Sequence, residues 1–264
     1  MVRCSACGFH HVNPEPGETE LLALYDAEYS GRHDLTWHGL EDELNRRVIR
    51  DLLRRGVHAL TDLGAGQGRF VHLARQAGID AVGVEPSPLN CAAARARYGL
   101  ELIPLGVRQF LATRPAGLEC ITMLNVLEHV PGPLTALRAL HEALRPAGTL
   151  AVVVPNVDFS LALARLRRAA RFRDVYMLHS TRFSQQGFDP PIHLSSFDAR
   201  HLRIALESAG LRVEHLGQAP VIRSSNPIAR LAKRTVAAAG RTIQLLSRGR
   251  IIWGYSLYAI ARRP

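Results

Sequence analysis

Residues 62–68 read Asp-Leu-Gly-Ala-Gly-Gln-Gly and join two segments of different periodicity. Residues 58–63, His-Ala-Leu-Thr-Asp-Leu, are predicted as a short strand that ends in glycines, whereas residues 69–76 are predicted as a helix. Closely spaced glycines at such a junction let the backbone approach a ligand, and the start of the helix offers unused N–H groups. The stretch therefore predicts a ligand-binding turn at the tip of a strand.

The glycine spacing narrows the kind of ligand. A dinucleotide-binding turn needs glycine where this chain has Arg69, and a phosphate-binding loop would need Lys followed by Ser or Thr. We therefore expect a ligand that places no pyrophosphate against the turn. Glu85 ends the next predicted strand, residues 81–85, where a carboxylate can accept hydrogen bonds from both ribose hydroxyls. Asp62 is expected to hold the loop or to meet an amino group of the ligand. The residues predicted to bind a nucleoside cofactor are thus Asp62, Gly64, Gly66, Gly68 and Glu85; a tight turn without a ligand is the alternative.

Strands and helices alternate along the rest of the chain. Further strands are expected at residues 101–105, 118–124, 149–154, 211–216 and 251–261, and helices at 88–98, 133–144, 198–209 and 227–247. Pro and Gly in residues 145–148 are expected to stop the helix before the fifth strand. Such alternation predicts an α/β fold with a doubly wound, mostly parallel sheet.

Composition divides the 264 residues into three parts. Residues 1–17 are rich in Cys, His and Pro, residues 18–55 are predicted as a helical cap, and residues 56–264 form the α/β domain. Within that domain we expect an insertion at residues 157–195, after the fifth strand, and a basic amphipathic helix at 227–247. With 47% hydrophobic residues the chain is long enough to bury one α/β core with additions.

The formal net charge is +10, and the basic residues gather in two places. Residues 165–173 hold five arginines, and residues 219–264 contain no Asp or Glu. Such clusters favour phosphate-bearing substrates, an anionic membrane surface or nucleic acid, and solvated helix faces are the alternative. No run of roughly 18 apolar residues and no N-terminal apolar signal core is present, so we expect a cytoplasmic protein that contacts membranes at most peripherally.

Several motifs follow the glycine turn in a fixed order: Val-Glu-Pro-Ser at 84–87, Asn-Val-Leu-Glu-His-Val at 125–130, Leu-Arg-Pro-Ala-Gly at 144–148 and Val-Pro-Asn at 154–156. Over about residues 45–216 the chain resembles the class I S-adenosylmethionine-dependent methyltransferases, in particular the small-molecule branch with a Leu-Glu-His motif after the fourth strand. The resemblance implies a seven-stranded Rossmann-like sheet whose last strand runs antiparallel.

The same resemblance implies S-adenosylmethionine as the cofactor, held by the glycine turn and Glu85. Leu124 and Asn125, at the end of the fourth strand, would line its methionine part. The chain departs from the family at residues 105–108, which lack the acidic residue that often follows the third strand. The adenine contact therefore falls to backbone groups or to Gln109.

Methyl transfer requires a positioned nucleophile and the removal of a proton. His129 follows the fourth strand, at the sheet edge where ligands bind. His193 lies in Pro-Ile-His-Leu-Ser-Ser-Phe, residues 191–197, which resembles a Pro-x-His-Leu-x-x-Phe motif of one methyltransferase branch. We predict catalytic roles for His193 and His129; the alternatives are a loop-anchoring hydrogen bond for His193 and helix capping for His129. Glu128 is predicted to orient the substrate, with a helix start as the alternative.

Two N-terminal features resemble that branch as well. Tyr25 and Tyr29 lie in a segment that covers the cofactor there, so they are predicted on the substrate side; packing between helices is the alternative. Cys4 and Cys7 form one CxxC, which resembles half of an N-terminal zinc ribbon. One CxxC supplies two of the four ligands of a structural zinc site, so we predict no metal, with zinc at these cysteines as the alternative.

These features predict methyl transfer to a small-molecule, glycan or lipid-linked acceptor. An RNA methyltransferase is an alternative that the net charge supports, although no aromatic-rich basic platform is present. DNA is not expected, because the Asn/Asp-Pro-Pro-Tyr/Phe motif of enzymes that methylate amino groups of nucleic acids is absent after the fourth strand. A non-catalytic subunit that binds S-adenosylmethionine is the third alternative.

Overall fold

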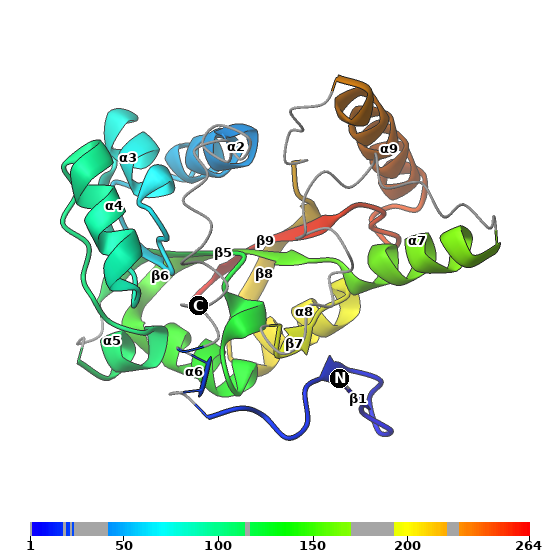
Figure 1. The fold of residues 1–264 in the computed structure, drawn as a ribbon, viewed down its shortest axis with the longest axis horizontal. Helices are drawn as coiled ribbons and strands as arrows, with labels where there is room; N and C mark the ends of the chain where they lie inside the picture. Colours follow the sequence, from blue (N-terminus) through cyan, green and yellow to red (C-terminus); the bar gives the residue numbers. More distant parts are fainter. Residues whose placement is uncertain are drawn as a thin grey trace.

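The computed structural model describes residues 2–17, 20–21, 23, 42–113, 117–169, 193–220 and 227–264. A central sheet carries helices on both faces (Figure 1). Its six strands are ordered β4-β3-β5-β6-β9-β8. Their bounds are β3 Ala59–Leu63, β4 Asp80–Val84, β5 Leu118–Leu124, β6 Leu144–Pro155, β8 Arg212–Gln218 and β9 Ser256–Arg262. The pairs β3–β4, β3–β5 and β5–β6 are parallel, whereas β9 runs antiparallel to both β6 and β8, which confirms the predicted direction of the last strand.

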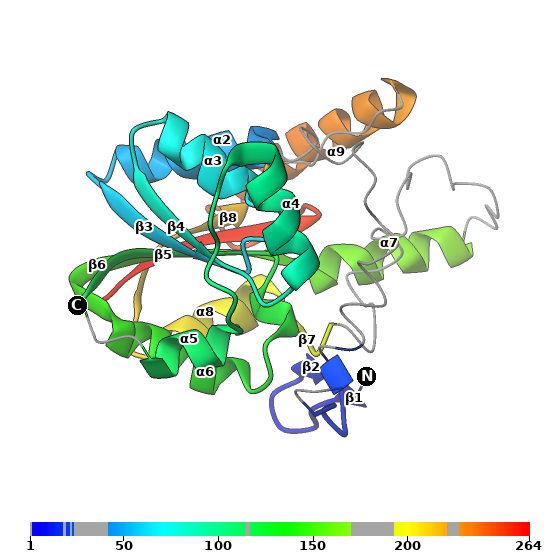
Figure 2. The same cartoon turned by 60° about the vertical axis from the view of Figure 1, so that its left-hand side comes forward.

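The helices form a layer on each side of this sheet (Figure 2). One layer holds α2 Asp42–Leu53, α3 Arg69–Gln76 and α4 Pro88–Tyr98. The other layer holds α5 Val107–Thr113, α6 Pro133–Ala143 and α8 Ala199–Ser208. The helices α7 Val157–Ala169 and α9 Pro227–Leu246 follow β6 and β8. Within the described residues no helix combines the length and the apolar character needed to cross a bilayer.

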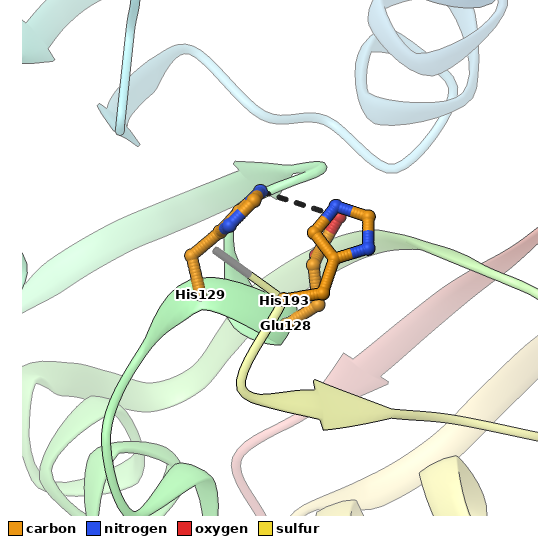
Figure 3. Close-up of side chains that lie close together, drawn as sticks. All are labelled: Glu128, His129 and His193. Carbon is orange, nitrogen blue, oxygen red and sulfur yellow. Dashed lines mark ion pairs between the residues drawn. The ribbon is translucent and has the colours of Figure 1, made fainter. Parts of the chain in front are cut away.

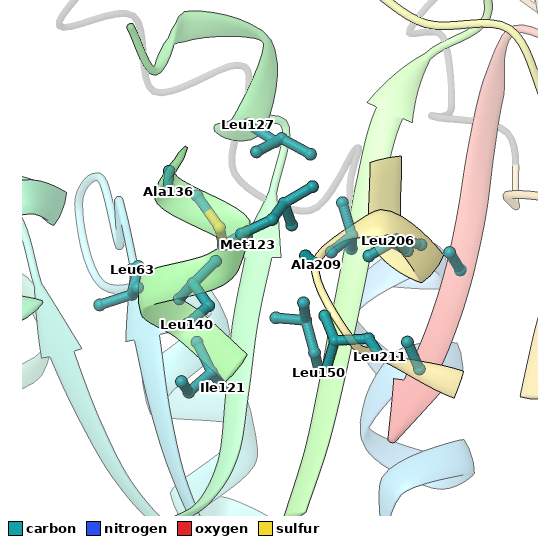
Figure 4. Close-up of a cluster of buried hydrophobic side chains, with 14 of the residues drawn as sticks. Leu63, Ile121, Met123, Leu127, Ala136, Leu140, Leu150, Leu206, Ala209 and Leu211 are labelled. Carbon is teal, nitrogen blue, oxygen red and sulfur yellow. The ribbon is translucent and has the colours of Figure 1, made fainter. Parts of the chain in front are cut away.

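The central strands of this sheet are buried on both faces. Along β6, Leu150 and Val152 pack into the cluster beneath α6 and α8, while Ala151 and Val153 pack into the cluster beneath α2 and α3. Figure 4 shows the first cluster, in which Met123 of β5 lies close to the side chains of α6. Because successive strand residues point to opposite faces, the nearly continuous apolar runs of β5 and β6 are what a doubly covered parallel sheet requires.

The prediction of a strand at residues 101–105, the third of seven expected along the chain, is wrong. Only Ile103 pairs with the sheet, through a single parallel bridge to Val84. Pro104 has no N–H, and the N–H of Leu105 turns back to the carbonyl of Ile103, so the ladder ends after one residue. The sheet therefore has six strands rather than seven.

Most other element bounds agree with the sequence prediction. Helices α3 and α4 and strand β5 have the expected ends. Helix α6 ends at Ala143, before residues 145–148, as expected. Strand β6, however, begins at Leu144 rather than at residue 149, and Leu144 pairs with Leu118 before a shift of register. The last strand begins at Ser256, later than expected, and helix α5 was not predicted.

A second, small sheet joins the N-terminal segment to the domain. It contains β1 Val2–Arg3, β2 His10–His11 and β7 Ser195–Ser196, with His10 opposite Ser196 (Figure 2). The ring of Phe9 packs 5.2 Å from that of Phe197. Residues 2–17 therefore pack against the chain just after His193. Of the expected helical cap, α2 lies within the described residues, whereas Tyr25 and Tyr29 lie outside them.

Candidate functional site

Glu85 and the glycine turn are joined at the carboxyl ends of β3 and β4. The N–H of Gly66 donates a hydrogen bond of 2.8 Å to Glu85 Oε2. The other carboxylate oxygen, Oε1, accepts from the Ser87 N–H at 3.1 Å and from Asn90 Nδ2 at 3.2 Å. The N–H of Gly64 donates to the carbonyl of Val84 at 2.8 Å. The buried carboxylate thus fixes the turn against the neighbouring strand and against the start of α4.

The three glycines of the turn have different surroundings. A Cβ at Gly64 would lie 2.5 Å from a methyl carbon of Val126, and one at Gly68 would lie 3.0 Å from Leu100. Both have positive φ, +73° and +79°, as does Gly66 at +52°. Around Gly66, however, no atom would lie within 4 Å of an added Cβ. Gly64 and Gly68 therefore let elements of the protein pack closely, while the backbone of Gly66 faces open space that a ligand can occupy.

Asp62, directly before the turn, links β3 to β5 through a side-chain hydrogen bond. Its Oδ1 accepts a hydrogen bond of 2.6 Å from Thr122 Oγ1. Burial raises the pKa of Asp62 to about 7, and the charge of Glu85 adds to the shift. This hydrogen bond runs to the neighbouring strand β5, and the two roles expected for Asp62 towards the loop and the ligand stay predictions.

Asn125 ends β5 with a backbone conformation that few residues adopt. Its φ is +57°, in the left-handed region that asparagine tolerates better than most residues. Its N–H donates to the carbonyl of Val153 at 2.8 Å, which holds the end of β5 against β6. Leu124, the residue before it, is half-buried against the core beneath α2 and α3. Both residues therefore lie at the same sheet edge as the glycine turn, as the sequence predicts.

Glu128, His129 and His193 form a buried cluster just beyond β5 (Figure 3). Each offers one metal-type donor atom, and these atoms lie within 4.8 Å of one another. The rings of His129 and His193 meet edge to face, with centroids 4.7 Å apart, and His129 Nε2 lies 3.9 Å from Glu128 Oε1. The N–H of Leu194 donates to the carbonyl of Glu128 at 2.8 Å. That bond brings His193 from a distant part of the chain to the Leu-Glu-His motif.

The carboxyl group of Glu128 is the least satisfied polar group of this cluster. Both of its oxygens are buried, and neither has a hydrogen-bond partner among the described residues. Burial disfavours the charged form and raises the pKa of Glu128 to about 8. A carboxyl group that holds its proton at neutral pH beside two imidazoles can donate or relay a proton. The two imidazoles and this carboxyl group are also donor types that divalent metals accept.

Sequence reasoning missed several residues at this edge. Thr122 holds Asp62, and a threonine within the apolar residues 120–124 could have indicated such a partner. Asn156 donates from Nδ2 to the carbonyl of Ile252 at 3.0 Å and pairs with Phe197 through a parallel bridge. Its motif was recognised, but its contacts depend on residues far along the chain. Gln109 accepts a hydrogen bond from the N–H of Gly106 at 3.1 Å, and its contact with the adenine stays a prediction.

Cys4 and Cys7 lie in a tight turn closed by a 2.9 Å hydrogen bond from the N–H of Gly8 to the carbonyl of Cys4. Hydrogen bonds from the backbone of Cys7 and Ala6 lower the pKa of the Cys4 thiol. Within the described residues, the grouped metal-type donors are Glu128, His129 and His193, and the two cysteines are not part of such a group. The turn thus offers two sulfur donors, and zinc there stays a hypothesis.

Comparison with known proteins agrees with this geometry. A family described as a methyltransferase domain matches residues 37–216. The ubiquinone biosynthesis O-methyltransferase of Pseudomonas aeruginosa (strain UCBPP-PA14) is 29% identical over 92 residues, which cover 33% of this chain and 40% of that protein. The tRNA U34 carboxymethyltransferase of Azotobacter vinelandii is 32% identical over 174 residues, 62% of this chain and 51% of that protein. The chain thus matches about half or less of the length of these relatives.

Solved structures share the fold at lower sequence identity. The 1,6-didemethyltoxoflavin-N1-methyltransferase of Burkholderia thailandensis, with bound 1,6-didemethyltoxoflavin and S-adenosylhomocysteine, has a TM-score of 0.59 and 17% identity. The match covers 97% of this chain and 94% of that chain. A SAM-dependent methyltransferase of Archaeoglobus fulgidus has a TM-score of 0.53 and 17% identity, covering 87% and 100%. With the fold, the ordered motifs and a family match over most of its length, the chain belongs to the methyltransferase domain family, as its resemblance to the S-adenosylmethionine-dependent class predicts.

Proposed function

We propose that this protein transfers the methyl group of S-adenosylmethionine to a small-molecule acceptor. The observation that carries the proposal is the hydrogen bond between the Gly66 N–H and the Glu85 carboxylate, beside open space at Gly66. Glu128, His129 and His193 gather at the same edge of the sheet. The cofactor supplies an electrophilic methyl group on a sulfonium centre. The protein must then hold the acceptor atom in line with that group and remove its proton.

Cofactor binding in this proposal uses the strand tips. Gly66 lets the cofactor lie against the backbone, and Glu85 receives the ribose hydroxyls in addition to fixing the turn. Leu124 and Asn125 line the methionine part, and Asp62 keeps β3 and β5 together beneath it. Gly64 and Gly68 contribute by close packing to Val126, Leu100 and Ala94, which fixes the shape of the turn.

Proton removal in this proposal belongs to the buried cluster. His193 accepts the proton of the acceptor, because histidine titrates near neutral pH and this imidazole is held at the cofactor edge by the Leu194–Glu128 hydrogen bond. His129 packs against its ring and orients it. Glu128, whose pKa is raised to about 8, orients the acceptor through a hydrogen bond. Tyr25 and Tyr29 are proposed on the substrate side, outside the described residues.

A small acceptor fits the cluster better than a large one. His129 and His193 are both buried, so an acceptor atom must enter an enclosed site to reach them. Two of the similar proteins are named for small acceptors, the ubiquinone and toxoflavin methyltransferases. RNA is the second candidate acceptor. A third similar protein, named as a tRNA carboxymethyltransferase, matches 62% of this chain, and the net charge of +10 suits an anionic acceptor.

A labelled-methyl assay tests the proposal. The purified protein is incubated with methyl-labelled S-adenosylmethionine and with separate small-metabolite, glycan, lipid and RNA fractions of host cells. The proposal predicts label in a metabolite, glycan or lipid fraction and none with Glu85→Ala. Label in RNA alone would favour the second candidate. Cofactor binding without label in any fraction would favour a non-catalytic subunit and contradict the proposal.

A further inference from the structure

Helix α9 packs against the domain through one face only. Gly240 lies directly on the loop that follows the helix, because an added Cβ there would be 1.9 Å from the carbonyl oxygen of Trp253. Gln244, four residues later, accepts a hydrogen bond of 3.3 Å from the N–H of Gln218 at the end of β8. Ala237, one turn earlier, is buried as well. These residues recur every three or four positions, so one side of the helix faces the protein.

The opposite side of α9 faces solvent and carries leucines near both ends of the helix, with Thr235, Ala238 and Thr242 exposed between them. Leu231 and Leu245, fourteen positions apart, lie on the same face of the helix, and Leu246 directly follows Leu245. Their exposed fractions are 69%, 78% and 81%. Ile251, in the loop after the helix, is 52% exposed. Leu245, Leu246 and Ile251 lie within seven positions at the end of the helix, and large apolar side chains that gather on an exposed surface mark a binding site more often than chance exposure.

Basic side chains lie beside the exposed leucines of α9. Arg234 and Arg241, seven positions apart, are exposed along one side of it, and Arg248 and Arg250 follow the helix. Residues 219–264 contain nine Arg and Lys and neither Asp nor Glu. A helix with exposed leucines, neighbouring arginines and no acidic residue has the character of helices that lie in the headgroup region of anionic membranes.

The loop after α9 is connected to the candidate acceptor site. Ile252 and Tyr255 accept hydrogen bonds of 3.0 and 2.9 Å from the side chain and the backbone of Asn156. Asn156 follows β6 at the sheet edge where the glycine turn lies, and it pairs with Phe197, four residues after His193. In Figures 1 and 2, α9 lies on the side of the molecule from which α7 extends after β6.

We propose that the lipid-facing surface, defined as Leu231, Arg234, Arg241, Leu245, Leu246, Arg248 and Ile251, docks on an anionic lipid bilayer. The leucines enter the boundary between headgroups and acyl chains, and the arginines pair with lipid phosphates. The acceptor then reaches the site from the membrane as a lipid or an amphiphile. This last step rests on the proposed methyltransferase function, whereas the docking itself does not.

Two other occupants fit this surface less well. A second copy of the chain would bring the arginines of both copies together without a carboxylate from residues 219–264 to neutralise them. A nucleic acid would use the arginines, but α9 carries no aromatic residue for stacking bases, and the exposed leucines would have no role. Of these three occupants, a lipid surface uses both kinds of side chain.

Vesicle co-sedimentation tests the docking. The intact protein is mixed with vesicles of phosphatidylcholine alone or with phosphatidylglycerol added. We expect binding to the anionic vesicles only, weakened by high salt. Leu245→Gln with Leu246→Gln, and separately Arg234→Gln with Arg241→Gln, should each lower the partition coefficient on the order of tenfold. The matched controls, Leu89→Gln on α4 at 45% exposure and Arg138→Gln on α6, should bind as the wild type does.

Several outcomes overturn the proposal. Equal binding to neutral and anionic vesicles, no binding to either, or unchanged binding by the leucine variant would each do so. Sedimentation of the protein with purified tRNA that depends on the arginines but not on the leucines would assign the surface to nucleic acid. The same variants are titrated with S-adenosylhomocysteine, which they should bind as the wild type does. Failure of the wild type to bind it would contradict the proposed function and leave the docking result standing.

Discussion

The N–H of Gly66 and the carboxylate of Glu85 are joined by a 2.8 Å hydrogen bond that links the tips of β3 and β4. Both strands are parallel, so the two groups lie at the same carboxyl edge of the sheet. The surroundings of Gly66 are open, whereas those of Gly64 are filled by Val126. One edge therefore combines a fixed turn, an accessible backbone and a carboxylate, which are the parts a nucleoside site needs.

Gly64→Ala should damage both stability and cofactor binding. The new methyl group would lie 2.5 Å from Val126 in a backbone with φ of +73°, so the turn has to move. We expect a loss of about 2–4 kcal/mol in the free energy of unfolding and loss of S-adenosylhomocysteine binding. Urea unfolding and calorimetry measure the two effects.

Gly56→Ala is the control for that substitution, because Gly56 has a φ of +72° but no atom within 4 Å of an added Cβ. It should lose only about 1 kcal/mol, from backbone strain alone, and keep cofactor binding. Equal losses in the two variants would show that close packing at Val126 is unimportant.

Thr122→Val should destabilise the domain by about 1–3 kcal/mol, because Asp62 would lose the donor that satisfies its buried carboxyl group. The size-matched control is Thr61→Val, at a buried position of the neighbouring strand β3. A double-mutant cycle with Asp62→Asn, followed by urea unfolding, isolates the coupling between the two side chains. Additive effects of the two substitutions would contradict the role given to this hydrogen bond.

Stability should fall as the pH rises, through Glu128. Its pKa is about 8 in the folded protein and close to 4.5 when unfolded, so between these values the folded state holds a proton that the unfolded state has lost. Unfolding therefore releases a proton in this pH range, and the free energy of unfolding should drop by about 2–4 kcal/mol between pH 5 and pH 8. Asp62, with a pKa raised to about 7, adds to the drop with the same sign.

Glu128→Gln should flatten this profile, since glutamine does not titrate. Glu142→Gln, an exposed position on α6, should leave it as in the wild type. Urea unfolding at several pH values gives the comparison. An equally steep decline in Glu128→Gln would mean that its carboxyl group is ionised in the folded protein.

His193→Gln should lower kcat by about 100-fold or more while leaving S-adenosylhomocysteine affinity unchanged, because a general base acts on the acceptor rather than on the cofactor. His129→Gln should have a smaller effect if its role is to orient His193. The exposed His58→Gln serves as the control. Activity of His193→Gln within about twofold of the wild type would remove His193 from the proton-transfer step.

The sequence predicted best what depends on neighbouring residues. The turn at 62–68, helix α3 and helix α4 follow from glycines, a capping Ser87 and apolar spacing within a few positions. The extra strand at 101–105 was predicted from its apolar pattern, but Pro104 ends the pairing after Ile103, a contact that the pattern does not reveal.

Contacts between distant residues were predicted less well. His193 and the Leu-Glu-His motif were each identified, yet their meeting depends on the Leu194–Glu128 hydrogen bond across 66 positions, which no local pattern encodes. The pairing of β2 with β7 is of the same kind, because strands of two residues carry almost no signal of their own.

The most direct test of the central claim is calorimetric titration of the purified protein with S-adenosylhomocysteine. We predict one site per chain, an affinity reduced on the order of 100-fold in Glu85→Ala, and an unchanged affinity in Glu142→Gln. No binding by the wild type, or equal binding by the wild type and Glu85→Ala, would contradict the assignment of Gly66 and Glu85 to a nucleoside cofactor.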